Sequence, residues 1–144
     1  MITPSRAKAK KAQLLKPWFW WIMLAISMGA VYILTSFQIF TGEHTVLVIR
    51  QITGLNEPDA YLMNAIARKS AHVLIYGFLA ILFYRVIRKR SIWYAWLCTL
   101  FLATLDEWLQ SFVPGRTPSG RDVVLDSIAA FIFLLGIVFF RKRR

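Results

Sequence analysis

The chain has 144 residues, and 58% of them are hydrophobic. That apolar fraction is wrong for a water-soluble core of this size, so the composition favours a lipid environment. A formal net charge of +11 would by itself indicate nucleic-acid binding, but the basic residues stand in short clusters between apolar stretches. Such clusters are typical of cytoplasmic loops, so we expect membrane lipids, and no nucleic acid, as partners.

Four apolar stretches have the length of membrane-crossing helices. A hydrocarbon core of about 30 Å requires about 20 helical residues, and the first stretch is longer than the apolar part of a cleavable signal peptide. The sequence therefore predicts an all-α integral membrane protein, folded as a four-helix transmembrane bundle in one domain, residues 1–144. The predicted spans are about residues 18–40, 69–87, 92–110 and 122–140.

The connection between the first two predicted spans, residues 41–67, is too long and too apolar for a plain loop. Glu57, Pro58 and Asp59 are typical of a helix start, so the second helix is expected to begin near Pro58 and to project outward. Residues 46–55 before it form either a short interfacial or re-entrant piece or a hydrophobic loop folded over the bundle.

The distribution of basic residues predicts the orientation in the membrane. Of the 18 Lys and Arg residues, 13 lie in the N-terminal arm, after the second span and in the C-terminal tail. The other five lie on the opposite side. Because Lys and Arg accumulate in cytoplasmic loops, both termini are expected in the cytoplasm and the protein in the bacterial cytoplasmic membrane.

Polar and ionisable side chains gather at the outer ends of three predicted helices. Inside an apolar zone each ionisable group costs roughly a few kcal/mol, so such groups normally face the bundle interior and have partners. Spacings of three and four residues place the members from each helix on a shared face. The cluster comprises Lys69, His72 and Tyr76 on the second helix, Asp106, Glu107 and Gln110 on the third, Arg116 in the turn, and Asp122 and Asp126 on the fourth.

Three chemical interpretations of this polar cluster stay open. The charges can be ion pairs that fix helix packing. His72 with two or more carboxylates can bind a divalent metal such as magnesium, manganese or zinc. Alternatively, Lys69 and Arg116 hold a phosphate or carboxylate while His72 or Glu107 moves a proton. We assign catalytic roles to His72, Asp106 and Glu107, and substrate binding to Lys69, Tyr76, Gln110, Arg116, Asp122 and Asp126.

Two segments resemble the VanZ-like family: RKSAHVLIYGFLAILFY at 68–84 and ATLDEWLQSFVPGRTPSGRDVVLDSIAAF at 103–131. That family pairs Lys-x-x-His-x-x-x-Tyr with Asp-Glu-x-x-Gln-x-x-x-x-x-Arg and a following Asp. Asp126, with Ser127 and Ala130 after it, departs from the Asn and Gly expected of many members and makes the site more acidic. The motif falls on Lys69, His72, Tyr76, Asp106, Glu107, Gln110, Arg116 and Asp122.

The resemblance implies a multi-pass bacterial membrane protein and a link to low-level resistance to the glycopeptide teicoplanin. We expect an envelope protein whose outward-facing pocket binds or processes an anionic, lipid-linked or cell-wall-derived ligand or a glycopeptide. The residues fit both an enzyme and a binding protein. One alternative is a transporter or scramblase, which would need a homo-oligomer for alternating access. The other is an accessory subunit with structural charges.

Overall fold

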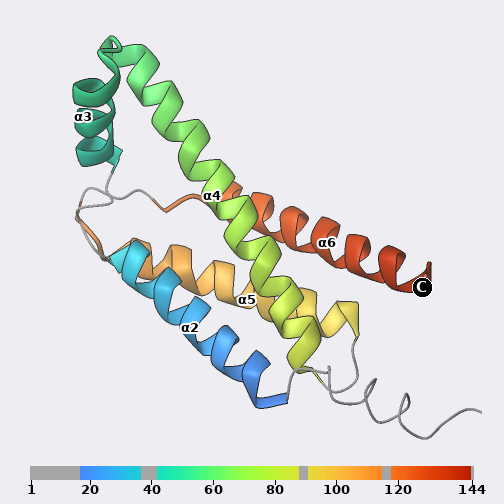
Figure 1. Ribbon diagram of the computed structural model, residues 1–144. Helices are drawn as coiled ribbons and strands as arrows, with labels where there is room; N and C mark the ends of the chain where they lie inside the picture. Colours follow the sequence, from blue (N-terminus) through green and yellow to red (C-terminus); the bar gives the residue numbers. More distant parts are fainter. Residues whose placement is uncertain (1–16, 37–41, 88–90, 115–117, 144) are drawn as a thin grey trace, which may run out of the picture.

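The computed structural model describes residues 17–36, 42–87, 91–114 and 118–143. These residues form helices and no strand, which confirms the predicted all-α class (Figure 1). The helices are α2 (Pro17–Ser36), α3 (Gly42–Thr53), α4 (Glu57–Val86), α5 (Ile92–Gln110) and α6 (Gly120–Lys142). By length and composition α4 and α6 can cross a membrane, and α2 contains a shorter apolar stretch, Pro17–Ile33.

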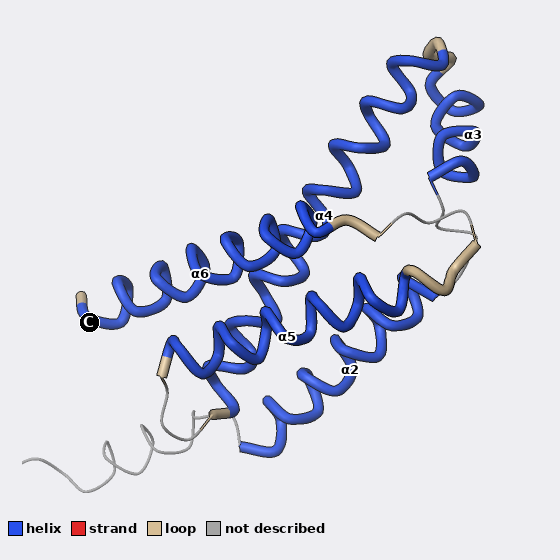
Figure 2. Tube along the Cα trace, turned by 180° about the vertical axis from the view of Figure 1, so that it is seen from behind, coloured by secondary structure: helices blue, strands red, loops and turns tan. Residues whose placement is uncertain are grey.

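Helix α4 is the centre of the fold, because it packs against α2, α3, α5 and α6. Its C-terminal half lies among α2, α5 and α6, whereas its N-terminal half extends away from them beside α3 (Figures 1 and 2). The Asn56 side chain caps α4 by accepting a hydrogen bond of 2.9 Å from the Asp59 amide, and Pro58 lies in the first turn. The predicted helix start near Pro58 is therefore confirmed.

The apolar segment before α4 is helical. Helix α3 packs along the N-terminal half of α4, where Val46 of α3 and Ala60 of α4 are buried. The Asn64 side chain ties the two helices together by donating a hydrogen bond of 3.3 Å to the Gly42 carbonyl. Of the two alternatives for residues 46–55, a hydrophobic loop folded over the bundle is wrong for residues 46–53, which are helical and satisfy their backbone polar groups locally.

The closest packing in the bundle joins α4 to α6. A Cβ atom added at Gly77 would stand 2.7 Å from ring atoms of Phe133, so the absent side chain lets this ring lie directly on the α4 backbone. One layer of the core lies toward the cytoplasmic ends predicted above and is formed by Ala80, Tyr84, Ala95, Ala130 and Leu134. This interface fixes α6 beside α4 and thereby places the start of α6 opposite the middle of α4.

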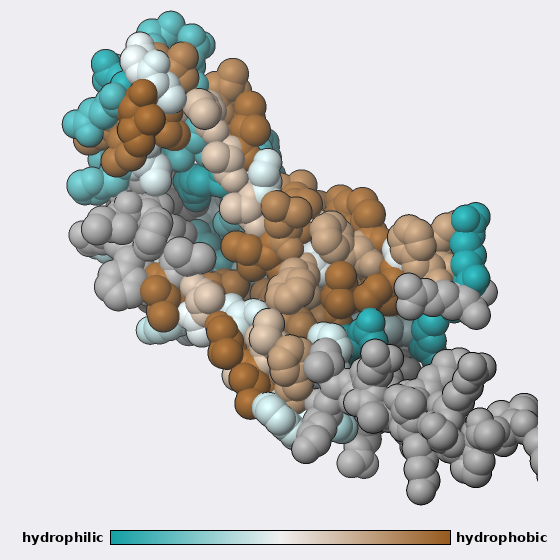
Figure 3. Space-filling view, in the orientation of Figure 1, coloured by the Kyte–Doolittle hydropathy of each residue, from teal (hydrophilic) through white to brown (hydrophobic). Residues whose placement is uncertain are grey.

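Large apolar side chains cover much of the outer surface. They include Ile26 on α2, Leu74 on α4, Phe101 on α5 and Ile132 on α6, which are between 59% and 70% exposed. Figure 3 shows this brown surface over the helices, with hydrophilic colour at the end formed by α3 and α4 and at the C-terminal end of α6. Exposed apolar area on this scale is typical of a surface that contacts a membrane or another protein.

Candidate functional site

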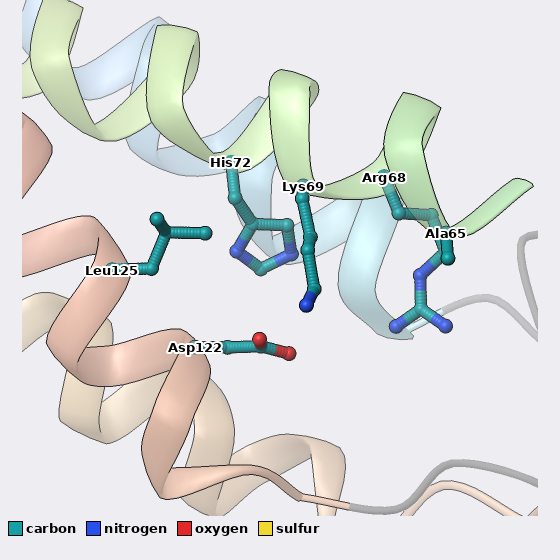
Figure 4. Close-up of a pocket in the computed structure, with 6 residues that line it drawn as sticks. All are labelled: Ala65, Arg68, Lys69, His72, Asp122 and Leu125. Carbon is teal, nitrogen blue, oxygen red and sulfur yellow. The ribbon is translucent and has the colours of Figure 1, made fainter. Parts of the chain in front are cut away.

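A pocket of about 150 Å³ lies between the middle of α4 and the start of α6 (Figure 4). Spacings of three and four residues bring its α4 members to one face of that helix. The Ser119–Gly120 backbone begins α6 just before its first pocket residue. The pocket is lined by Ala65, Arg68, Lys69 and His72 of α4 and by Asp122 and Leu125 of α6.

Two cations and one carboxylate share this pocket without pairing to each other. Figure 4 shows Lys69 and Asp122 pointing toward one another from α4 and α6, with Arg68 on the same side. Over the described ranges, the ion pairs within 4.0 Å are Arg50–Glu57 and His72–Asp126. Arg68, Lys69 and Asp122 therefore have no charged partner among the described residues, and their charges face the pocket.

A contact with α6 fixes the orientation of the His72 side chain. Its Nδ1 atom lies 3.0 Å from the Asp126 Oδ2 atom. Asp126 is only 1% exposed, and its second oxygen, Oδ1, has no hydrogen-bond partner among the described residues. A carboxylate accepts hydrogen bonds, so the contact favours the proton on Nδ1 and leaves Nε2 as the nitrogen that can exchange a proton with a ligand.

A second polar network lies deeper, between α4 and α5. Both the Tyr76 hydroxyl and the Gln110 side-chain amide donate hydrogen bonds of 2.9 Å to the same oxygen of Asp106, Oδ2. All three side chains are buried. The Tyr76 ring also stacks on the His72 ring at a centroid distance of 5.8 Å. The deeper network thus supports the imidazole of the pocket from one side.

Glu107 connects the end of α5 to the start of α6. Its Oε2 atom accepts a hydrogen bond of 2.7 Å from the Ser119 backbone amide. Negative charge is favourable near a helix N-terminus, where backbone N–H groups lack partners within the helix. Glu107 is therefore placed to fix where α6 begins, and through this to position Asp122.

The structure divides the nine predicted site residues into three groups. Lys69, His72 and Asp122 line the pocket. Arg116 lies outside the described residues. The buried layer beside the pocket contains Tyr76, Asp106, Glu107, Gln110 and Asp126.

One pocket residue, Arg68, was missing from the predicted site. It is four residues before His72, and this spacing places the two on one helix face. That spacing was the available signal.

The metal interpretation needed His72 together with two or more carboxylates. Among the described residues, Asp126 is the carboxylate within contact of His72. No group of three or more His, Cys, Asp or Glu side chains in the described part of the chain is arranged to hold a metal ion. The arrangement instead provides cationic groups beside an imidazole whose orientation is fixed.

The fold and the site together define a class: a helical bundle around a long central helix, with a buried acidic network beside a cationic pocket. Within that class, the chain belongs to the VanZ/LLP1 family, whose sequence model matches residues 11–141. The resemblance seen in the two motif segments is thereby confirmed and extended to nearly the whole chain. No match was found among curated proteins or among solved structures.

Proposed function

We propose that this protein is a multi-pass membrane protein with four spans and both termini in the cytoplasm. The length and apolar character of α4 and α6, the exposed apolar surface and the 13 basic residues on one side support this. In this orientation the pocket between α4 and α6 lies toward the extracytoplasmic face. The α3–α4 projection then extends from the same face.

The pocket binds an anionic head group of a lipid or of a lipid-linked cell-wall intermediate. The observation that carries this proposal is the presence of Arg68 and Lys69 in one pocket without a charged partner among the described residues. Lys69 is exposed and Arg68 is half-buried, so both cations are accessible to a ligand that enters the pocket. A guanidinium beside an ammonium suits a phosphate, because Arg can bind two oxygens at once.

His72 supplies proton transfer at the bound head group. The hydrogen bond to Asp126 fixes the imidazole tautomer and orientation, and His72 lines the same pocket as Arg68 and Lys69. A positioned imidazole next to an anion-binding pair is suited to general acid–base chemistry on a phosphate-linked group. In this proposal Asp106 and Glu107 position the site and do not touch the ligand.

Glycopeptide resistance follows from this proposal as a cellular consequence. A protein that binds or alters a lipid-linked wall intermediate changes the amount or form of the material that a glycopeptide meets at the cell surface. Expression of the protein should then raise the teicoplanin concentration needed to stop growth, and Lys69→Gln should remove that increase. If cells with and without the protein are equally susceptible to teicoplanin, the resistance role is contradicted and the proposed head-group binding is not.

The decisive experiment measures stability and ligand retention together. Lys69→Gln and Arg68→Gln should each melt near the temperature of the unmodified protein while losing roughly tenfold or more of the copurifying phosphate-bearing lipid, since one charge-assisted contact is worth about 1.5 to 3 kcal/mol. Arg121→Gln is the matched control, because Arg121 lies near the start of α6 without lining the pocket. Arg116→Gln extends the test to the turn.

A structural role for the charges is the second candidate, and one observation favours it. Asp106 and Glu107 each accept hydrogen bonds from Tyr76, Gln110 or the Ser119 amide, so both carboxylates have partners within the fold. An accessory subunit would show this arrangement. If Lys69→Gln and Arg68→Gln collapse the melting temperature, and no lipid is enriched on the unmodified protein, this second function replaces the first.

A further inference from the structure

A second hollow, of about 160 Å³, lies between α2 and α4. We call it the α2–α4 groove. Apart from the hydroxyl of Ser27, its lining side chains are apolar, and two of them, Ser27 and Ala30, are small. The small side chains of α2 leave space that a larger residue would fill. The groove is lined by Ser27, Ala30 and Val31 of α2 and by Ile75, Phe78 and Leu79 of α4.

One stripe of α4 carries residues of both the α2–α4 groove and the cationic pocket. Arg68 and His72 of the pocket and Ile75 and Leu79 of the groove follow each other at intervals of four, three and four residues. At 100° per residue these four positions fall within a narrow arc of the helix surface. At a rise of 1.5 Å per residue, the centres of the two hollows are separated by roughly 10 to 15 Å along α4.

The order of the two hollows matches the order of groups in a membrane lipid. Charged residues line the hollow nearer the projecting end of α4, and apolar residues line the hollow deeper in the bundle. The groove is open at its edge, because Phe78 is 43% exposed and Ala30 is also exposed. A hydrocarbon chain could therefore enter from the side.

We infer that the two hollows bind one molecule, a lipid whose anionic phosphate head group lies in the pocket and one of whose hydrocarbon chains lies in the α2–α4 groove. This inference rests on the proposed head-group pocket and narrows its ligand to an amphiphile that stays in the membrane. Charge complementarity selects the head, and the order of the two hollows along α4 sets the direction of the chain. A free sugar phosphate lacks the part that the groove would hold.

Photolabelling of the full-length protein in phosphatidylcholine nanodiscs tests the inference. The probe is phosphatidic acid with a diazirine in one acyl chain, and labelled positions are mapped by peptide mass spectrometry. We expect label on the residues of the α2–α4 groove. Lys69→Gln should reduce that label roughly tenfold, because it removes one charge-assisted contact with the head group. A phosphatidylcholine probe with the same chain should label the groove far less.

A pair of variants on α2 separates the groove from the pocket. Ala30→Leu should fill the groove and remove its label, whereas Ala25→Leu, at an exposed position that does not line the groove, should leave the label unchanged. The enrichment of phosphatidic acid on the purified protein is measured in parallel, so that head-group binding is scored independently of chain position.

Three outcomes contradict the inference in different ways. Equal groove labelling by the phosphatidylcholine probe means that any lipid fills the groove, and this holds even if Lys69→Gln fails to fold. Enriched phosphatidic acid with label confined to other surfaces leaves the proposed function intact and removes the inference. If phosphatidic acid is not enriched on the protein and labelling of the groove does not depend on charge, the proposed function is contradicted as well.

Discussion

His72 on α4 and Asp126 on α6 are joined through Nδ1 and Oδ2 at 3.0 Å, although 54 residues separate them in the chain. The contact links the floor of the pocket to the tightest interface of the bundle, since Phe133, two helical turns beyond Asp126, lies against Gly77. The orientation of the imidazole therefore depends on how closely α6 approaches α4.

The His72–Asp126 contact should appear as a coupling energy. In a double-mutant cycle with His72→Gln and Asp126→Asn, the two single changes should not add, and the coupling should be about 0.5 to 2 kcal/mol in the free energy of unfolding in detergent. A parallel cycle between His72→Gln and Tyr61→Phe is the control and should be additive, because Tyr61 lies in the N-terminal half of α4, away from His72. Additivity in both cycles would falsify the contact.

Tyr76→Phe should lower the free energy of unfolding by about 1 kcal/mol. The change removes one of the two hydrogen bonds that the buried Oδ2 atom of Asp106 accepts from described residues, and the bond from the Gln110 amide remains. Tyr61→Phe changes the same group on the same helix at a side chain that is 48% exposed, so its effect should be within error of zero. Chemical unfolding of both variants in the same detergent measures the difference.

Gly77→Ala should destabilise the bundle by about 1 to 3 kcal/mol, because the new Cβ would stand 2.7 Å from the Phe133 ring. Gly136→Ala, with nothing within 4 Å of the added atom, is the matched change on α6 and should be neutral or slightly stabilising. Adding Phe133→Leu to Gly77→Ala should recover part of the loss. Equal stability of the two alanine variants would argue against the close packing of α4 on α6.

Glu107 should tolerate glutamine better than alanine. A glutamine side chain keeps an oxygen that can accept the hydrogen bond of the Ser119 amide, whereas alanine leaves that amide without this partner, at a cost of about 1 to 2 kcal/mol. Melting temperature and lipid enrichment should therefore fall in Glu107→Ala and stay near the original values in Glu107→Gln. Loss of ligand turnover in a well-folded Glu107→Gln variant would instead restore the catalytic role predicted from the sequence.

The topology should be visible in reporter fusions. A cytoplasm-active reporter placed after Arg144 should be active, and a reporter active outside the cytoplasm should be silent there, because 13 basic residues favour the cytoplasmic side. The same pair inserted after Gly54, at the turn between α3 and α4, should give the opposite result. A C-terminal reporter that works outside the cytoplasm would place the pocket on the other face.

Much of the architecture is determined by the sequence through local rules. Apolar stretches of sufficient length indicate α2, α5 and α6. The Glu57-Pro58-Asp59 start of α4 follows from the fit of proline and acids to a first helical turn. The two motif segments indicate the family. The sequence did not decide whether residues 46–53, now part of α3, are helical, because a short apolar run without clear end signals fits several structures.

Which ionisable groups meet depends on how the helices pack against one another. Asp122 and Asp126 share a face of α6, yet Asp126 contacts His72 while Asp122 faces the pocket with Arg68 and Lys69. Periodicity fixes the direction of a side chain around its own helix axis. Periodicity does not fix the angle at which two helices cross or how far one is shifted along the other. In this protein, packing contacts such as Phe133 on Gly77 set both the angle and the shift.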